Sequence, residues 1–549
     1  MAFRFAVLIS AFSLIYGGLV WKLYDVQLQN GSLYSNAAET QLRLAGVLEP
    51  VRGYIYLSDK HGDKIPVAMN ADFPFVYAVP KELANAEAAA ASLSAIVGRS
   101  ADFLTSIFGK KNDPYEPLIT KATKEQVDAV NELNIDGLYV VQHPARSYPL
   151  NNLASQVVGF VSANGSKDNR PQGQYGIESF YNGDLLGKEG AVDGDVVKSS
   201  EAGKDIVLTI DRNIQARAEN ILGKLTSEHD APSGSFIVEE PKTGKILAMG
   251  GLPGFDPNNY GGADIKNFLN PNVQGVYEPG SIFKVITMAT GIDSGAITPD
   301  TTYYDAGSVK MNGRTISNWD YEEKGAHGNI TMTQVIEQSV NTGAIFAEKQ
   351  IGHKTFYDYL KKFGLKELTK IDLPGERTGS LAPMEVRGAP DVNFATASYG
   401  QGLSVTPIRL ISAISALANG GILMRPYVNA NLKPEVIRRA VSADAAKKVT
   451  DMMISAVDKA AIAKIPGYFV AGKTGTAYVP DFGKNRYTDQ VINTYVGFAP
   501  ASDPQFVILI KLDKPARAPL AGTTVVPAFR ELAEFILSYY NVKPDRTEN

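Results

Sequence analysis

The sequence predicts a chain of three parts: one N-terminal membrane helix, a mixed α+β region, and a larger C-terminal domain in which helices and strands alternate. Three observations predict this. One uncharged run lies near the N-terminus, from Phe5 to Trp21. Turn signals and short apolar runs are typical of the chain up to about residue 200. From about residue 205, strand-like runs alternate with helices whose ends carry capping residues. At roughly 150 residues per domain, the length of 549 residues suits two to four domains.

The first element is the uncharged run, FAVLISAFSLIYGGLVW, which lies between Arg4 and Lys22. At ~1.5 Å per residue its 17 residues extend about 25 Å, the short end of what crosses a bilayer. A cleaved signal peptide is the alternative, but the residues that follow, Trp21 to Tyr24, are bulky, and no small-residue cleavage site follows the run. We therefore expect a cytoplasmic stub and a single uncleaved anchor over residues 1–24. The charge bias across the run is weak, so its orientation stays open.

Residues 25–200 are expected to form the mixed α+β domain. Apolar positions up to about residue 50 fit a helix leaving the membrane, and the alanine-rich stretch Glu82–Ala95 predicts another helix. The polar stretch Asn164–Gln172 predicts an exposed loop. The charged, glycine-rich segment Gly187–Lys204 indicates a linker, and we place the domain boundary there, at residue 200.

Residues 201–549 carry sharper signals. Asp211 is placed to cap a helix that runs to about residue 229, Thr331 and Gln334 form a T-x-x-Q capping box, and Thr406 opens a helix closed by two glycines. Strands are predicted at residues 206–210, 235–239, 245–249, 469–479, 493–499 and 506–512, and a last helix begins at Pro527. Because strands stand at both ends of the domain with helices between them, we expect one antiparallel sheet closed by distant parts of the chain.

The composition excludes several classes of chemistry. The chain has no cysteine, so disulfides, thiolate metal sites and cysteine nucleophiles are excluded. No two of its five histidines stand at the spacing of a metal pair, which argues against zinc chemistry and against a Ser-His-Asp set. We expect no metal and no cofactor. With a net charge of −4 the chain has no basic field for a phosphate backbone, so we expect no nucleic-acid partner.

The first motif that carries chemistry is S-I-F-K, from Ser281 to Lys284. The chain-breaking residues Tyr277–Gly280 precede it and an apolar run follows, which places Ser281 at a helix N-terminus with Lys284 one turn further on the same face. An amine beside a hydroxyl can accept its proton when burial keeps the amine neutral. The pair therefore predicts a serine nucleophile with a lysine base. A lone S-x-x-K match is more often a helix start with a solvated lysine, so the other motifs decide.

The second motif, S-V-N, follows the helix with the capping box, so Ser339 and Asn341 are expected on a loop. Ser339 could pass a proton between Lys284 and a leaving amine. Asn341 offers an amide that could hold a substrate carbonyl and orient the lysine.

The third motif, K-T-G-T, lies on a predicted strand. Alternation places Lys473 and Gly475 on one face and Thr474 and Thr476 on the other. Lys473 would supply positive charge for a carboxylate, and Gly475 would let the substrate backbone approach closely. The backbone N–H groups of Ser281 and Thr476 would form an oxyanion hole.

These three motifs, in this order, resemble those of the penicillin-binding protein and serine β-lactamase superfamily. Ser339 lies 58 residues after Ser281 and Lys473 lies 192 residues after it, spacings similar to those of the transpeptidase branch. Further segments resemble class B penicillin-binding proteins along nearly the whole chain: R-G-Y-I at 52–55, R-S-Y-P at 146–149, G-I-E at 176–178, F-D-P-N at 255–258, Y-G-Q-G at 399–402 and G-F-A-P at 497–500. One departure is Ile282, where the family commonly has threonine; we expect it to affect helix packing or antibiotic fit more than mechanism.

The resemblance implies a fold and a reaction. The fold is a β-lactamase-like transpeptidase domain with an antiparallel sheet and helices on both faces, over residues 201–549, preceded by a pedestal (dimerisation-type) domain over residues 25–200. In the reaction, Ser281 attacks the D-Ala-D-Ala carbonyl of a peptidoglycan stem peptide and expels D-alanine. The acyl-enzyme then passes to an amine of a neighbouring stem peptide. A β-lactam would acylate the same serine and stall there.

The resemblance also implies a place and partners. The catalytic domain would lie outside the cytoplasm, held at the cytoplasmic (inner) membrane by one helix, beside a SEDS-family glycan polymerase and other division proteins. The E-P-G of Glu278–Gly280 and the compact stretch Thr476–Asn493 look more like the cell-division (septal) type. The elongation type is the alternative.

A different class of protein shares one of these segments. Gly467–Thr474 satisfies the G-x-x-x-x-G-K-T pattern of a phosphate loop, and Phe506–Asp513 imitates the strand that ends in a metal-binding aspartate. A phosphate loop needs a helix that starts at its lysine, whereas Gly475 and Pro480 disfavour one here. A P-loop ATPase is therefore a remote alternative. A second K-T-G, Lys242–Gly244, precedes the serine between two short strands and is expected to be a hairpin turn.

Within the superfamily, a class A β-lactamase would need a deacylating glutamate in an E-x-x-L-N segment after Ser339, and none is present. A β-lactam-binding sensor would be expected to carry more membrane helices. A scaffold with an idle site stays open on residues alone.

Overall fold

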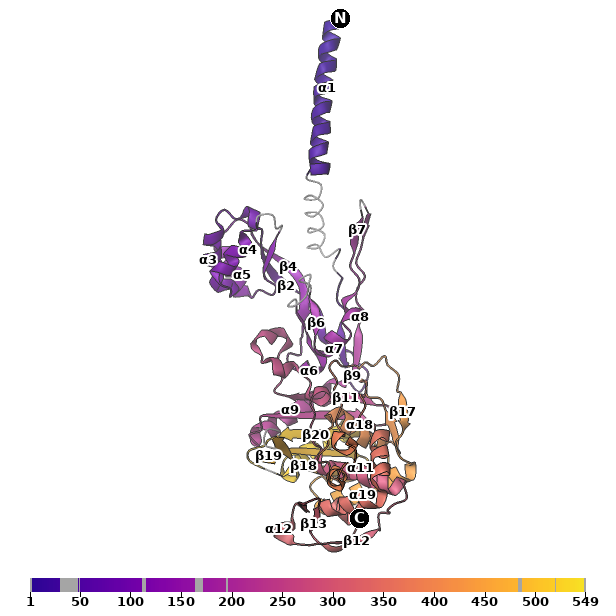
Figure 1. Cartoon of the computed structure of the whole chain (residues 1–549). Helices are drawn as coiled ribbons and strands as arrows, with labels where there is room; N and C mark the ends of the chain where they lie inside the picture. The colour runs from indigo at the N-terminus through magenta and orange to yellow at the C-terminus, as the bar shows by residue number, and fades with distance from the viewer. Residues whose placement is uncertain are drawn as a thin grey trace. The chain divides into compact units, whose positions relative to one another are not determined.

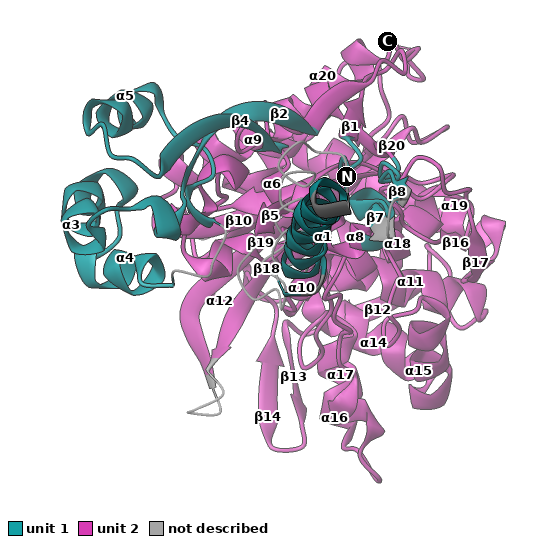
Figure 2. Cartoon of the chain, turned by 90° about the horizontal axis from the view of Figure 1, so that it is seen from above, with its two compact units in different colours: residues 1–54, 68–147, 183–204 teal, residues 55–67, 148–182, 205–549 magenta. Residues whose placement is uncertain are grey.

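The computed structural model describes residues 2–29, 48, 50–110, 115–162, 171–193, 196–481, 486–518 and 520–547. These divide into two compact units, coloured in Figure 2: unit 1 holds residues 1–54, 68–147 and 183–204, and unit 2 holds residues 55–67, 148–182 and 205–549. The chain crosses between the units several times. Its last crossing, at residues 204 and 205, lies within a few residues of the boundary expected from the sequence.

The segment Gly187–Lys204 is a hairpin, and the prediction of a linker was wrong. Strands β7 (Ala191–Asp193) and β8 (Val196–Lys198) pair antiparallel, and Lys188 and Glu201 form a further bridge below them. Valines on both sides of a Gly-Asp pair are a hairpin signal, which the high charge and glycine content of the segment obscured.

Helix α1 spans Ala2–Tyr24 and continues as the π-helical turn η1, Asp25–Gln29. Within the described residues it is the one helix long and apolar enough to cross a membrane, over Arg4–Gln27. An 18-residue stretch of it has a mean hydropathy of 1.7, and no part of that stretch is buried by the protein. The helix expected to follow it falls mostly on residues 30–47 and 49, outside the described residues, as does most of the predicted loop at 164–172.

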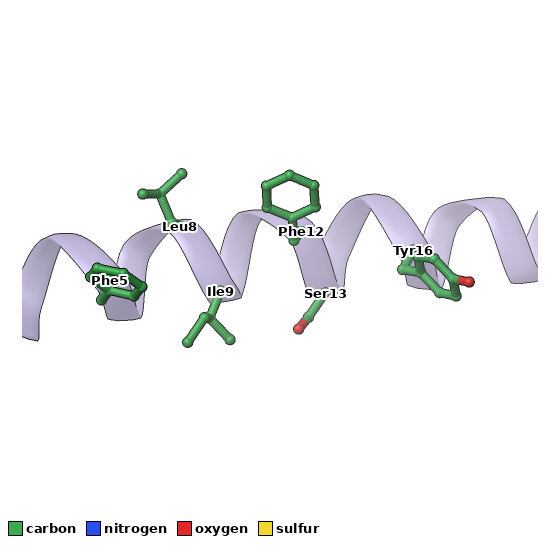
Figure 3. Close-up of a pocket in the computed structure, with 6 residues that line it drawn as sticks. All are labelled: Phe5, Leu8, Ile9, Phe12, Ser13 and Tyr16. Carbon is green, nitrogen blue, oxygen red and sulfur yellow. The ribbon is translucent and has the colours of Figure 1, made fainter.

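Six side chains surround a hollow along α1, as Figure 3 shows: Phe5, Leu8, Ile9, Phe12, Ser13 and Tyr16. All six stand on a single helix, and none of the described protein covers them. A ligand site requires walls from more than one element to bury its ligand. The hollow is therefore part of an exposed apolar surface of the kind that suits lipid.

Unit 1 contains a small sheet with helices on one face. Strand β2 (Ile65–Ala78) pairs antiparallel with β3 (Glu116–Ile119) and with β4 (Leu138–Ser147). Its inward residues pack with helices α3 (Ala86–Val97), α4 (Ala101–Phe108) and α5 (Lys124–Glu132). Helix α3 begins four residues later than predicted, because Asn85 caps it by accepting from Ala88 N and the preceding residues form the 3-10 turn η2, Pro80–Glu82.

Unit 2 is built around a five-stranded antiparallel sheet in the order β11-β10-β20-β19-β18 (Figure 1). Its strands are β10 (Ser233–Glu240), β11 (Lys245–Leu252), β18 (Ala471–Asp481), β19 (Arg486–Ala499) and β20 (Phe506–Asp513). The pairing of β10 with β20 joins the first and last parts of this domain, so the predicted closure of one sheet by distant segments is confirmed.

Helices cover both faces of this sheet. Helices α9 (Arg212–Glu228) and α20 (Val525–Tyr539) pack on one face over residues such as Phe236 and Ile508. Helices α18 (Pro407–Ala418) and α19 (Ala443–Ala460) pack on the other face, and α11 (Lys284–Asp293) contacts α19. Because both faces are covered, residues 506–510 of β20 form a continuous apolar run without alternation.

The predicted helix ends are confirmed at three places: Asp211 caps α9, Thr331 and Gln334 form a capping box on α13 (Met332–Gln338), and Thr406 caps α18. The last helix begins two residues before Pro527.

The remaining helices of unit 2 are α6 (Ser155–Val158), α7 (Gly176–Phe180), α10 (Pro271–Gln274), η3 (Pro257–Gly262), η4 (Ile265–Phe268), η5 (Gly280–Phe283), α12 (Tyr321–Lys324), α14 (Asn341–Ile351), α15 (His353–Lys362), α16 (Ala382–Glu385), α17 (Asp391–Ala397) and η6 (Ala521–Thr523); α8 (Asn182–Leu186) follows α7.

Short strand pairs complete the fold. Strand β1 (Ile55–Ser58) runs parallel to β9 (Ile206–Asp211). The other pairs are antiparallel: β5 (Phe160–Ser162) with β6 (Gln172–Gln174), β12 (Thr302–Asp305) with β15 (Gly328–Thr331), β13 (Ser308–Met311) with β14 (Arg314–Ser317), and β16 (Ile422–Met424) with β17 (Val436–Arg439). The β12–β15 and β13–β14 pairs lie just before α13 in the chain, next to the predicted S-V-N loop in sequence.

Candidate active site

Ser281 lies in the 3-10 turn η5, which runs directly into α11 at Lys284. The turn begins at Gly280, whose φ of 57° lies in the left-handed region that glycine adopts without strain. Ile282 and Phe283 are fully buried and fix the turn to the core. The structure therefore places Ser281 at the start of a buried helix, as the sequence predicts.

A second glycine supports this turn from outside. Gly280 N donates to Gly400 O at 3.1 Å, and Gly400 has a φ of 82°. A Cβ atom at Gly400 would come within 2.2 Å of Gly280 O, so only glycine fits there. Glu278, at the entry to the turn, accepts from Gly402 N at 3.1 Å and from the Tyr487 hydroxyl at 3.0 Å. The Y-G-Q-G segment thus packs against the serine turn and forms hydrogen bonds with Gly280 and Glu278.

Lys284 is fully buried beside the serine. Its Nζ lies 3.0 Å from Ser281 Oγ, 2.5 Å from Ser339 O and 3.2 Å from Ser339 Oγ. Burial, and secondly the charge of Lys473, hold the pKa of Lys284 well below its usual value, while Asp320 opposes them. A lysine with a lowered pKa is neutral in a larger fraction of molecules and can accept a proton from the serine.

Ser339 occupies the position between the two lysines of the site. It is the C-cap of α13, with a φ of 57°. Its Oγ lies 3.2 Å from Lys284 Nζ and 3.0 Å from Lys473 Nζ. The loop placement predicted from the capping box is confirmed, and the hydroxyl is within proton-transfer distance of both amines.

Asn341 begins α14, two residues beyond Ser339. Its side-chain Nδ2 donates to Ser317 O at 3.0 Å, so the amide nitrogen is engaged by the chain itself. The sequence did not predict this partner.

Lys473 lies on β18 and is only 3% exposed. Burial lowers its pKa to about 7. Its Nζ also contacts Thr474 O at 3.2 Å and Thr474 Oγ1 at 3.3 Å. Among the described residues, no carboxylate lies within ion-pair distance of Lys473 or Lys284, so any charge on these amines is available to a ligand.

The face alternation predicted for the K-T-G-T strand is present. Lys473 and Gly475 are buried, whereas Thr474 and Thr476 are partly exposed, and Thr476 Oγ1 accepts from Ala521 N at 3.3 Å. The reason for the glycine differs from the expected one, because its close neighbour is the serine turn. A Cβ at Gly475 would lie 2.8 Å from Pro279 O and 3.1 Å from Ile282 Cγ1. Ile282 therefore does act in packing, as its departure from the family suggested.

Replacing Gly475 by alanine is expected to slow acylation of the serine by roughly a hundredfold, because the new methyl group must displace the turn that carries Ser281, and displacement of a reacting group by about 1 Å has that effect. Stopped-flow acylation with a fluorescent penicillin measures it. Gly223 lies in α9, where a Cβ atom would come no closer than 4.0 Å to Leu252, and Gly223→Ala is the control. Equal rates for the two variants would contradict this role of Gly475.

Two further segments imitate functional motifs, a phosphate loop at Gly467–Thr474 and a second K-T-G at Lys242–Gly244, and the geometry decides what each one is. Strand β18 continues through Lys473 to Asp481, so no helix begins at the lysine, as expected, and the remote alternative of a phosphate loop at Gly467–Thr474 is excluded. The second K-T-G is the turn between β10 and β11, with Gly244 at a φ of 83°. It is the hairpin turn that the sequence predicts.

Three residues near the site were not found from the sequence: Asp305, Asn318 and Trp319. Trp319 contacts Gln338 on one side of Ser339, and Asn318 and Asp305 contact Thr342 on the other side. These three residues stand in short segments with no spacing relation to the three motifs, so no periodic signal could have indicated them.

Comparison with known proteins agrees with this geometry. Residues 234–534 match the family of the penicillin-binding protein transpeptidase domain, and residues 47–221 match the penicillin-binding protein dimerisation domain. The chain belongs to the class B penicillin-binding proteins. As a member of this family it is a transpeptidase of the serine acyltransferase type.

Relatives of this penicillin-binding protein cover most of its length. It is 30% identical to stage V sporulation protein D of Bacillus subtilis, over 98% of this chain and 86% of that protein. It is 32% identical to penicillin-binding protein PbpB of Mycolicibacterium smegmatis, over 72% and 65%. Penicillin-binding protein 3 of Mycobacterium tuberculosis, solved in complex with aztreonam, has a TM-score of 0.69 at 26% identity and covers 91% of this chain and 98% of its own.

Proposed function

We propose that this penicillin-binding protein cross-links peptidoglycan stem peptides through an acyl intermediate on Ser281, with Lys284 as the base. The observation that carries the proposal is the position of Lys284: the amine is fully buried, has a lowered pKa and lies 3.0 Å from the serine hydroxyl. No histidine is needed for such a pair.

In the acylation half, Ser281 gives its proton to Lys284 and attacks the carbonyl carbon of the penultimate D-alanine. The bond from that carbon to the terminal D-alanine nitrogen breaks, and the proton returns through Ser339 to the leaving amine. The backbone N–H groups of Ser281 and Thr476 stabilise the oxyanion. In the second half, the amine of a neighbouring stem peptide attacks the ester carbon and gives up a proton to Lys284. The bond from that carbon to Ser281 Oγ breaks, and Lys284 returns the proton to Oγ.

The strand with the K-T-G-T motif holds the substrate. Lys473 supplies positive charge for the terminal carboxylate, with the partly exposed Thr474 and Thr476 beside it and Gly475 keeping strand and serine turn in contact. Asn341 Nδ2 gives one N–H to Ser317 O, and its other N–H holds a substrate carbonyl. A β-lactam acylates the same serine and stays there, because its ring-opened acyl group blocks the acceptor amine.

A direct assay tests the reaction. A peptide that ends in D-Ala-D-Ala, mixed with the full chain and an amine acceptor, should release D-alanine and give a cross-linked product in equal amounts. Release of D-alanine without any cross-linked product would contradict transpeptidation and favour a carboxypeptidase.

The pH dependence of acylation follows from the two lysines. Protonated Lys284 cannot accept a proton, so the rate falls as pH drops through its lowered pKa. Lys473, with a pKa of about 7, loses its charge as pH rises above that value, and attraction for a carboxylate weakens. A bell-shaped profile of the second-order acylation rate is expected. Because the charge of Lys473 lowers the pKa of Lys284, Lys473→Met should move the acid limb to higher pH; an unmoved acid limb would contradict this coupling.

The proposal extends to the whole chain. Residues 1–24 form a cytoplasmic stub and a single anchor in the cytoplasmic (inner) membrane, residues 25–200 a pedestal, and residues 201–549 the transpeptidase domain outside the cytoplasm. One apolar helix and the match to the dimerisation family support this arrangement. A SEDS-family glycan polymerase would supply the strands to be cross-linked.

We place the protein in septal wall synthesis. The E-P-G before the nucleophile and the compact stretch Thr476–Asn493 support this, and one relative is named a peptidoglycan D,D-transpeptidase FtsI homolog. Depletion in the source cell should give filaments that fail to divide. Rounded cells would favour the elongation type, and unchanged shape with altered β-lactam response would favour a sensor or scaffold.

A further inference from the structure

Ser339 has a backbone conformation that needs support from outside its own loop. It is a non-glycine residue with φ 57° and ψ 43°, in the left-handed region. Such a conformation costs a few times the thermal energy for an L-residue and persists only where the surroundings enforce it. Because Ser339 contacts both lysines of the site, whatever enforces its conformation also sets the geometry of proton transfer.

Three consecutive residues, Ser317 to Trp319, hold the loop on both sides of Ser339. On one side, Trp319 Nε1 donates to Gln338 O at 3.0 Å. On the other side, Asn341 Nδ2 donates to Ser317 O at 3.0 Å, and Thr342 N donates to Asn318 Oδ1 at 3.1 Å. The residue before Ser339 and the two residues at the start of α14 are thus tied to one short segment, the 317–319 segment.

Asp305, at the end of β12, in turn fixes the 317–319 segment. Its carboxylate is fully buried and accepts from Asn318 Nδ2 at 3.1 and 3.0 Å and from Thr342 Oγ1 at 2.5 Å. It also accepts from Gly307 N and from His327 N, both at 3.0 Å. Burial alone would raise the pKa of Asp305, but these hydrogen bonds outweigh it and the pKa lies below its usual value. The group is an ionised acceptor surrounded by donors.

The charge on Asp305 decides how Asn318 is oriented. Since the carboxylate only accepts, Asn318 must turn its Nδ2 toward it. Its Oδ1 is then left to accept from Thr342 N, at the first turn of α14. An amide at position 305 would turn its NH2 group toward at least two of these four donors, and Asn318, which donates to both oxygens, would have to move.

We propose that Asp305 is a positioning residue for the transpeptidase reaction: acting through Asn318 and Thr342, it holds the Ser339–Asn341 loop so that the Ser339 hydroxyl lies between Lys284 and Lys473. This inference rests on the proposed function of those residues. It assigns a mechanistic part to the β12–β15 region, which carries none of the three motifs.

The test compares buried carboxylates in the full-length protein. Asp305→Asn is compared with Asp372→Asn, whose carboxylate is 2% exposed and likewise accepts two backbone N–H groups, from Val428 and Asn429, but outside the site. The first-order acylation constant and the binding constant for a fluorescent penicillin are measured separately. Asp305→Asn should lower the acylation constant by about a hundredfold, and more than it weakens binding, since displacement of a group by about 1 Å is sufficient for this. Asp372→Asn should leave the acylation constant unchanged.

If Asp305→Asn does not fold, a second pair of variants tests the same hydrogen-bond network. Thr342→Val removes the hydroxyl that donates to Asp305, and Thr342→Ser keeps it, so acylation should fall in the first and be retained in the second. If both act through one network, the Asp305→Asn, Thr342→Val double variant should be no slower than the slower single one. An unchanged acylation constant in folded Asp305→Asn, an equal loss in Asp372→Asn, or equal rates for the two Thr342 variants would overturn the inference. Absence of acylation in the unaltered protein would instead overturn the proposed function, and this inference with it.

Discussion

Ser281→Ala is expected to abolish covalent labelling by a fluorescent penicillin while the chain stays folded. The hydroxyl is the group that forms the ester, and its Oγ lies 3.0 Å from Lys284 Nζ at the start of α11. Alanine fits the 3-10 turn because the turn is fixed by the buried Ile282 and Phe283 and not by the serine hydroxyl. Fluorescence of the denatured protein on a gel measures the label, and a thermal unfolding curve checks the fold.

The matched control is Ser294→Ala, which removes a hydroxyl at the other end of the same helix, where it donates to Gly291 O at 3.2 Å. This variant should label like the unaltered protein. Undiminished labelling of Ser281→Ala would show that another residue carries the acyl group.

Lys284→Met is expected to lower the acylation rate by about a thousandfold, within the range that a general base contributes. Methionine has nearly the volume of lysine and fills the same buried space, so the chain should stay folded, although Ser339 O loses the donor that it has in the unaltered protein. The second-order rate with a fluorescent penicillin measures the loss.

Lys284→Arg separates a base from a fixed charge. Arginine keeps a positive charge beside the serine but is not deprotonated in proteins, so it should be as slow as the methionine variant. Lys242→Met, in the K-T-G of the hairpin turn, is the control and should acylate normally. An arginine variant that acylates at the normal rate would mean that Lys284 acts by its charge and not as a base.

Local signals in the sequence predicted the elements that carry the catalytic side chains. The capping box at Thr331 starts the helix that ends one residue before Ser339, and the chain break at Glu278–Gly280 starts the helix of Ser281. Strand alternation placed Lys473 on the buried face. In each case the deciding residues lie within a few positions of the motif, where periodicity and capping chemistry act.

Features set by contacts between distant segments could not be read in this way. Asp305 reaches Asn318 and Thr342 because two short strand pairs fold back before α13, and nothing in residues 302–331 alone indicates that they serve Ser339. Gly475 is required because it packs against a turn almost 200 residues earlier in the chain. The sequence does not show this contact, so the glycine was assigned to substrate approach. The hairpin at Gly187–Lys204 was missed because the charge and glycine content of the segment suggested a linker. Its two paired strands together contain only six residues, three of them valines.

The central claim is that one serine, Ser281, receives the acyl group with Lys284 as its base. Mass spectrometry of the unaltered full-length protein after reaction with a penicillin tests it most directly. We predict one adduct per chain, carried by the peptide that contains Ser281 and absent in Ser281→Ala. An adduct on a different residue, or an intact mass that does not change, would contradict the account.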